Sequence, residues 1–155
     1  PNPEVSIDGT DMEVYFSPDD GVADRIYEIL TDADESIYFM AFSFTTDEFG
    51  EAIREQAQNG LTVAGVMEEQ QVKSNIGTEY DFFKQAELDV FLDGNEGQMH
   101  HKTMIVDERI VITGSYNFSR SAEIRNDENV VIFYNEKIAD FFLDEFQRVY
   151  EQVQR

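Results

Sequence analysis

One short segment, residues 100–117, holds residues whose types and spacing could do chemistry. It reads HHKTMIVDERIVITGSYN and combines imidazole, ammonium, carboxylate, hydroxyl and carboxamide groups. An ammonium with neutral hydrogen-bond donors suits a phosphate group, and an imidazole serves as a nucleophile or proton carrier near neutral pH. The candidate residues are His100, Lys102, Asp107, Gly114, Ser115 and Asn117.

The elements that must position these groups can be read from the same segment. Residues 102–106 and 110–113 are apolar runs joined by three polar residues, which predicts two adjacent strands with a short connection. Alternate residues of a strand share a face, so His100 and Lys102 point together and His101 points away. Folding the hairpin then brings residues 114–117 back beside His100.

Asp107 has a different place in this pattern. Its odd spacing from His100 puts it on the other strand face. We therefore expect its carboxylate to order the hairpin rather than to touch the substrate. By itself His100 would more often be a structural histidine than a catalyst, and it is the company of the other groups that favours catalysis.

The spacing HxK, four residues, D, six residues, GSxN resembles the HKD motif of the phospholipase D superfamily. The segments FSPDDG, AFSFT and NGLTV resemble other landmarks of that domain, so the resemblance covers about residues 12–150. It implies that His100 attacks phosphorus to give a phosphohistidine, which water then hydrolyses. Lys102 and Asn117 would hold the phosphoryl oxygens, and Ser115 would assist.

A nucleophilic histidine also needs an acceptor that fixes its other ring nitrogen. Glu128, in the sequence NDEN, matches the position where the family places that carboxylate. The histidine mechanism implies no cofactor and no metal ion. The chain also lacks an evident cluster of metal ligands.

The number of motifs predicts the oligomeric state. The chain contains one HxK sequence, and its only histidines are His100 and His101. In the superfamily a second motif histidine protonates the leaving oxygen, so the resemblance implies a homodimer with the active site across its two-fold axis. Two-fold dimers are also the commonest soluble oligomers.

Composition limits the remaining possibilities. A chain of 155 residues with 41% hydrophobic residues and 13 phenylalanines can bury one core, so we expect one domain over residues 1–155. The absence of cysteine excludes a disulfide scaffold, and no apolar run has the length of a transmembrane segment. We expect a soluble chain. It begins at Pro1, which indicates a processed, secreted form or a domain of a longer protein and leaves the compartment open.

The net charge opposes a nucleic-acid substrate. With 33 acidic and 11 basic residues the formal charge is −22, and a polyanion should be repelled at low ionic strength. Such acidity resembles proteins of salt-loving organisms, where the Debye length falls to about 3 Å at 1 M salt. From residue 102 to residue 125 there are four basic and three acidic residues, so the motif region is far less acidic than the whole chain.

Hydrophobic periodicity predicts an α/β fold with a mixed β-sheet flanked by helices on both faces. Strands are expected at 12–16, 36–44, 61–67, 88–92 and 129–134, besides the motif hairpin. Helices are expected from a turn at 17–21 to residue 33, from a cap at Thr46 to residue 58, at 80–86 and at 137–154, with a variable polar segment at 70–77. The last helix would place Phe141, Phe142, Phe146 and Val149 on its apolar side.

Three function classes fit these observations. The favoured one is a metal-independent phosphodiesterase that cleaves nucleic acid, because the chain is small and carries a single motif. A phospholipase D that cleaves phospholipids is the alternative, although no amphipathic membrane-binding segment is obvious and anionic membranes would repel the chain. A binding module with a decayed site is the least supported, because all the motif positions are intact.

Overall fold

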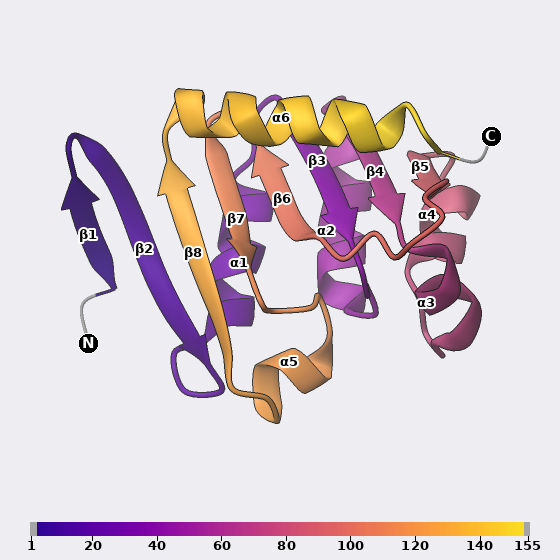
Figure 1. The fold of residues 1–155 in the computed structure, drawn as a ribbon, viewed down its shortest axis with the longest axis horizontal. Helices are drawn as coiled ribbons and strands as arrows, with labels where there is room; N and C mark the ends of the chain where they lie inside the picture. Colours follow the sequence, from indigo (N-terminus) through magenta and orange to yellow (C-terminus); the bar gives the residue numbers. More distant parts are fainter. Residues whose placement is uncertain (1–2, 154–155) are drawn as a thin grey trace.

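The computed structural model describes residues 3–153, which form a mixed eight-stranded sheet with helices against both of its faces (Figure 1). The strand order is β1-β2-β8-β7-β6-β3-β4-β5. Strand β3 pairs in parallel with β4, and β4 with β5, whereas the other neighbours are antiparallel. The strands are β1 (Glu4–Ile7), β2 (Thr10–Ser17), β3 (Ser36–Ala41), β4 (Thr62–Met67), β5 (Asp89–Leu92), β6 (Lys102–Val106), β7 (Ile110–Gly114) and β8 (Glu128–Tyr134).

The helices divide between two hydrophobic cores, one on each face of the sheet. Helices α1, α2 and α4 contribute Ile26, Phe49 and Phe83 to the larger core, and α6 contributes Phe146 to the smaller one. This arrangement confirms the predicted fold class. The helices are α1 (Val22–Thr31), α2 (Asp47–Gln58), α3 (Glu69–Ser74), α4 (Tyr80–Gln85), α5 (Arg120–Ile124) and α6 (Glu136–Tyr150).

The motif hairpin lies in the middle of this sheet. Strand β6 is buried along its whole length, with Met104 in the larger core and Ile105 in the smaller one. Antiparallel pairing with β7 sets Thr103 opposite Thr113, and their hydroxyl oxygens are 3.1 Å apart. A central strand buried on both faces holds its register firmly, because a slip by one residue would exchange the two cores. The site at its end is therefore built on a rigid element.

Several details differ from the sequence-based expectations. The polar segment expected at 70–77 overlaps helix α3, which begins at Glu69. The side chain of Glu68 caps the first turn of this helix by accepting a hydrogen bond from the backbone of Gln71. Thr46 is the N-cap residue of α2 as expected, but its hydroxyl makes no cap hydrogen bond. Phe141 is 75% exposed, because it lies on the side of α6 that faces away from the sheet. Strand β1 and helix α5 were not expected.

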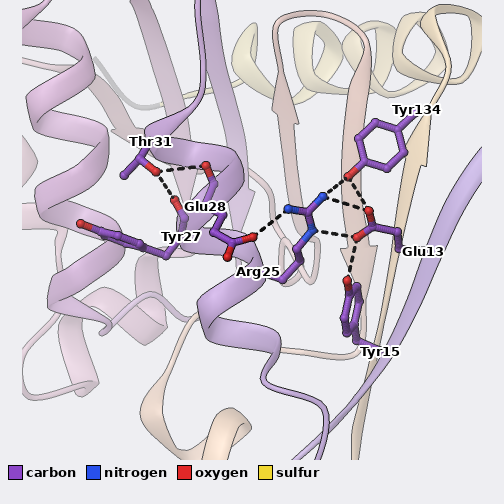
Figure 2. A network of polar contacts seen from close by, with 7 residues as sticks. All are labelled: Glu13, Tyr15, Arg25, Tyr27, Glu28, Thr31 and Tyr134. Carbon is purple, nitrogen blue, oxygen red and sulfur yellow. Dashed lines mark hydrogen bonds and ion pairs between the residues drawn. The ribbon is translucent and has the colours of Figure 1, made fainter. Parts of the chain in front are cut away.

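A polar network ties α1 to the sheet (Figure 2). Arg25 on α1 donates to both carboxylate oxygens of Glu13 on β2, at 2.8 and 2.9 Å, and to the hydroxyl of Tyr134 on β8 at 2.8 Å. The hydroxyl groups of Tyr15 and Tyr134 also donate to Glu13. Burial alone would raise the pKa of Glu13, but these hydrogen bonds together lower it below its ordinary value. The pKa of Tyr15 is raised to about 12 by burial and by the neighbouring carboxylate.

None of the helices within residues 3–153 has the length and apolar character that crossing a bilayer requires.

Candidate active site

His100 and Lys102 lie together where β6 begins. The Lys102 Nζ atom is 3.4 Å from each ring nitrogen of His100 and donates to the His100 backbone oxygen at 3.0 Å. His101 points to the opposite sheet face, where its Nε2 atom lies 3.1 Å from a carboxylate oxygen of Glu145 on α6. Strand alternation therefore separates the two histidines as the sequence predicts.

An aromatic ring, to which the sequence assigned no role, contacts both of these groups. The ring of Phe42, directly after β3, contacts the imidazole of His100 edge to face with ring centroids 4.3 Å apart. The Lys102 ammonium lies 4.9 Å from the centroid of the same ring. Burial lowers the pKa of Lys102, and the nearby carboxylate of Glu128 opposes that shift. Phe42 belongs to the AFSFT segment, so its position was visible in the sequence but its contact was not.

The GSxN end of the hairpin returns beside β8. A side chain at Gly114 would place its Cβ atom 2.1 Å from the backbone oxygen of Asn129, so the close approach of the two strands requires glycine. The Ser115 hydroxyl donates to Glu128 at 2.6 Å and accepts from the backbone of Asn129 at 3.0 Å. These two hydrogen bonds hold Ser115 at the end of β7.

Glu128 accepts a second hydrogen bond from the Asn126 side chain at 2.9 Å. Within residues 3–153 of one chain, none of its hydrogen bonds reaches His100. The role of Glu128 in orienting the histidine therefore stays a prediction. In this structure its carboxylate accepts a hydrogen bond from Ser115, and its negative charge favours the charged form of Lys102.

Asn117 is the last residue of the motif, and the residue after it is paired with the chain just beyond β3. Its neighbour Phe118 forms an isolated parallel bridge with Phe44 and donates its backbone N–H to Ser43. The Asn117 Oδ1 atom is buried and has no hydrogen-bond partner in the described part of the chain. This oxygen is an acceptor, so the atom of Asn117 that could donate to a phosphoryl oxygen is the carboxamide nitrogen.

Asp107 lies at the far end of the hairpin from His100. Its carboxylate accepts hydrogen bonds from three consecutive backbone N–H groups, those of residues 34–36, at 2.7–3.1 Å. Its own backbone N–H donates to the oxygen of Ser36 at 2.9 Å. Asp107 thus joins the β6–β7 turn to the start of β3 and does not face the other motif residues.

The site is open to solvent at the ends of the central strands β6 and β7. His100 and Ser115 are exposed, Glu128 and Asn117 are half-buried, and Lys102 is buried. Within the part of the chain that the structure describes, no group of three or more His, Cys, Asp or Glu side chains is arranged to hold a metal ion. The arrangement offers an accessible imidazole, a cation beside it, and neutral hydrogen-bonding groups at the edge, which together can bind and attack a phosphate ester.

Known proteins resemble this chain in sequence over most of its length. Residues 26–150 match the family described as "Cardiolipin synthase, PLD-like domain". The chain is 31% identical to a phospholipase D of Rickettsia prowazekii over 134 residues, which are 86% of this chain and 65% of the relative. It is 34% identical to the human mitochondrial cardiolipin hydrolase over 128 residues, 83% of this chain. The chain thus spans about two thirds of the first relative and half of the second.

Solved structures share the fold over nearly the whole chain. A phospholipase D family member, Nuc, from Salmonella typhimurium superposes with a TM-score of 0.86 at 28% identity, covering 94% of this chain and 97% of Nuc. NucT from Helicobacter pylori has a TM-score of 0.87 at 21% identity, covering 93% of this chain and 98% of NucT. The second likeness concerns the fold alone.

Proposed function

Since the chain belongs to the phospholipase D superfamily, we propose that it is a metal-independent phosphodiesterase that cleaves nucleic acid through a phosphohistidine. The observation that carries the proposal is the exposed imidazole of His100 with the Lys102 ammonium 3.4 Å from its ring nitrogens. A nucleophile must be accessible to phosphorus, and a cation beside it attracts the anionic ester to the point of attack.

The reaction divides into two displacements. A ring nitrogen of His100 forms a bond to phosphorus, and the bond from phosphorus to the leaving oxygen breaks with its electron pair on that oxygen. His100 of the partner subunit supplies a proton to the leaving oxygen. Water then attacks phosphorus and gives a proton back to that imidazole, while the nitrogen–phosphorus bond breaks and frees His100. Lys102 holds the phosphoryl oxygens throughout.

The remaining motif residues bind or position. Asn117 donates from its carboxamide to a phosphoryl oxygen, and Ser115 assists from its place beside Glu128. Gly114 permits the close approach of β7 and β8 that sets Ser115, and Asp107 orders the hairpin from its far end. Glu128 orients an imidazole. No cofactor or metal ion is assigned to any of these roles.

The second histidine makes a homodimer part of this proposal. The chain has one HxK sequence, and His101 is turned to the other sheet face against Glu145. A proton donor for the leaving oxygen must therefore come from elsewhere, and a second copy related by a two-fold axis supplies the same residue. We also propose that the chain acts as one domain.

The test is cleavage of labelled single- and double-stranded DNA and RNA in EDTA, at low and at multimolar salt. The wild type, His100→Asn and the matched control His101→Asn are compared. Cleavage by the wild type and by His101→Asn, with none by His100→Asn, supports the proposal. Multimolar salt should favour cleavage, because screening weakens the repulsion between the substrate and a chain of charge −22. A folded wild type that cuts none of these substrates would overturn it.

A phospholipid substrate is the alternative. The names of two relatives, phospholipase D and mitochondrial cardiolipin hydrolase, favour it. The same variants are therefore assayed on cardiolipin and phosphatidylcholine vesicles. Release of headgroup or phosphatidate that depends on His100, in the absence of nucleic-acid cleavage, would replace the nuclease by a phospholipase.

A further inference from the structure

Helix α5 follows the motif directly and lies beyond the ends of β7 and β8 (Figure 1). Hydrogen bonds tie the chain at both of its ends to the motif site. Before the helix, the backbone N–H of Phe118 donates to the oxygen of Ser43 on the segment after β3. After the helix, the side chain of Asn126 donates at 2.9 Å to Glu128, which also accepts from Ser115. The position of α5 is therefore fixed relative to the motif residues.

Helix α5 also lies on the same face of the sheet as the motif side chains. Met104 and Val130 pack in the larger core, and alternation along β6 and β8 turns Lys102 and Glu128 to that face. Ala122 of α5 packs in the same core, whereas α6 covers the opposite face. A substrate whose phosphate lies beside Lys102 can therefore reach α5 without crossing the sheet.

Two exposed arginines belong to this helix: Arg120 is its first residue and Arg125 is its C-cap. Within residues 3–153 neither side chain has an ion pair, a hydrogen bond or a ring contact. The carboxylate of α5 itself, Glu123, instead accepts from the Ala23 backbone and the Tyr116 hydroxyl, both at 3.0 Å. Other basic side chains contact a carboxylate, a carbonyl oxygen or an aromatic ring, namely those of Arg25, Arg54, Lys73, Lys84, Arg109 and Arg148. In a chain of charge −22, unpaired cations beside the site can attract an anion there.

We propose that Arg120 and Arg125 bind the phosphate next to the scissile one in the substrate strand. This inference rests on the nuclease activity proposed above. A nucleic-acid strand carries one charge per nucleotide, so a strand held at Lys102 offers a second phosphate to neighbouring cations. Guanidinium groups bind phosphate through paired N–H donors. Asp127 and Glu128 follow α5 and repel that phosphate, and the two arginines offset this repulsion.

The two arginines are thus substrate-binding residues outside the reacting centre. Their loss should raise KM and leave kcat nearly unchanged, because a contact kept throughout the reaction strengthens the substrate complex and the transition state alike. We expect Arg120→Gln/Arg125→Gln to raise KM about tenfold at low salt, as the loss of charge-assisted hydrogen bonds predicts. The effect should shrink as salt rises, because screening weakens the attraction. Arg120→Lys/Arg125→Lys keeps both charges and should retain most of the binding.

The experiment uses two oligonucleotides of equal length and base sequence. One has phosphodiesters throughout, and the other has a single central phosphodiester between neutral methylphosphonate linkages. The proteins are wild type, the two double variants, the single variants Arg120→Gln and Arg125→Gln, and the matched control Lys137→Gln. The control removes one positive charge, as each single variant does, from the exposed start of α6 on the opposite sheet face.

We expect the Gln double variant to raise KM on the phosphodiester strand, and Lys137→Gln to leave it unchanged. On the methylphosphonate strand all the proteins should match wild type, which also shows that the variants are folded and their reacting centres intact. Equal KM values for wild type and the Gln double variant on the phosphodiester strand would overturn the assignment and leave the nuclease proposal standing. An equal rise on both strands would also overturn it, because the lost contact would not be to a neighbouring phosphate.

A binding measurement removes catalysis from the comparison. The labelled phosphodiester strand is titrated with His100→Asn, with and without the two Arg→Gln substitutions, and its fluorescence anisotropy is followed from low to multimolar salt. The substitutions should weaken binding at low salt, and the ratio of the two Kd values should approach one as salt rises. A ratio of one at every salt concentration would overturn the inference. Cleavage of phospholipid vesicles but of no oligonucleotide by the wild type would overturn both proposals.

Discussion

The ring of Phe42 lies edge to face against the imidazole of His100, with centroids 4.3 Å apart, although 58 positions separate the two residues in the chain. The contact arises because β3 and β6 are paired, with Ala41 opposite Lys102. One aromatic ring thus limits the rotation of the candidate nucleophile and shields the ammonium beside it.

Removal of that ring should disturb the reaction more than the fold. We expect Phe42→Ala to lower kcat about 10- to 100-fold, because a misplaced nucleophile loses its favourable orientation. Burial lowers the pKa of Lys102, so hydration of the site should raise that pKa toward its ordinary value. The alkaline limb of the pH–rate profile should then move to higher pH. Phe42→Tyr should behave as wild type, and an unmoved profile in Phe42→Ala would argue against this positioning role.

Subunit mixing tests the shared site. Equal amounts of wild type and His100→Asn are allowed to exchange subunits, and cleavage is measured before and after. Random exchange leaves about a quarter of the dimers with two intact histidines, against about half before exchange, so activity should fall to about half. Activity that stays constant after proven exchange would show that each chain works alone.

Loss of the Asp107 carboxylate should destabilise the protein. It accepts hydrogen bonds from the three backbone N–H groups of residues 34–36, and an amide can replace it only in part. We expect Asp107→Asn to lower the free energy of unfolding by about 1–3 kcal/mol in urea titrations. Glu108→Gln, at the exposed next position, serves as the control and should change little. Equal stability of both variants would contradict the ordering role.

The Glu13–Arg25 network should make stability depend on acid. The folded-state pKa of Glu13 is lowered, so the contribution of its ionised form is present above its ordinary pKa of 4.5 and is lost as pH falls through the folded value. Urea unfolding between pH 3 and 7 should show that loss in the wild type. In Glu13→Gln the loss of stability at acid pH should be smaller. This variant should also be less stable than wild type at pH 7. Parallel pH profiles would exclude the network as its source.

Glu79 should act in the opposite direction. Burial raises its pKa to about 7, and the neighbouring carboxylate of Asp47 adds to that shift. Its stabilising effect is therefore present below pH 4.5 and is lost as pH rises through about 7. In urea titrations the free energy of unfolding of Glu79→Gln should exceed that of wild type by on the order of 3 kcal/mol at pH 8 and by little at pH 4. The substitution Glu55→Gln, at an exposed residue of α2, should show no such trend, and a flat difference for Glu79→Gln would disprove the assignment.

The sequence by itself determined the local parts of the site. Alternation along a strand placed His100 with Lys102 and turned His101 away, and two apolar runs around a three-residue connection predicted the β6–β7 hairpin. These features depend on the geometry of neighbouring residues, which is nearly the same in every protein. For the same reason the periodicity of the longer helices and strands indicated the fold class.

Only the tertiary structure decided which distant groups meet. The order of the strands brings Phe42 to His100 and leaves Phe16 exposed beyond α6, and no local pattern encodes that order. Short elements such as α3 and α5 were missed because few residues give little periodicity, and α3 depends on a cap from Glu68. The exposure of Phe141 was missed because the pattern shows that a helix has an apolar side, whereas packing alone fixes where that side ends.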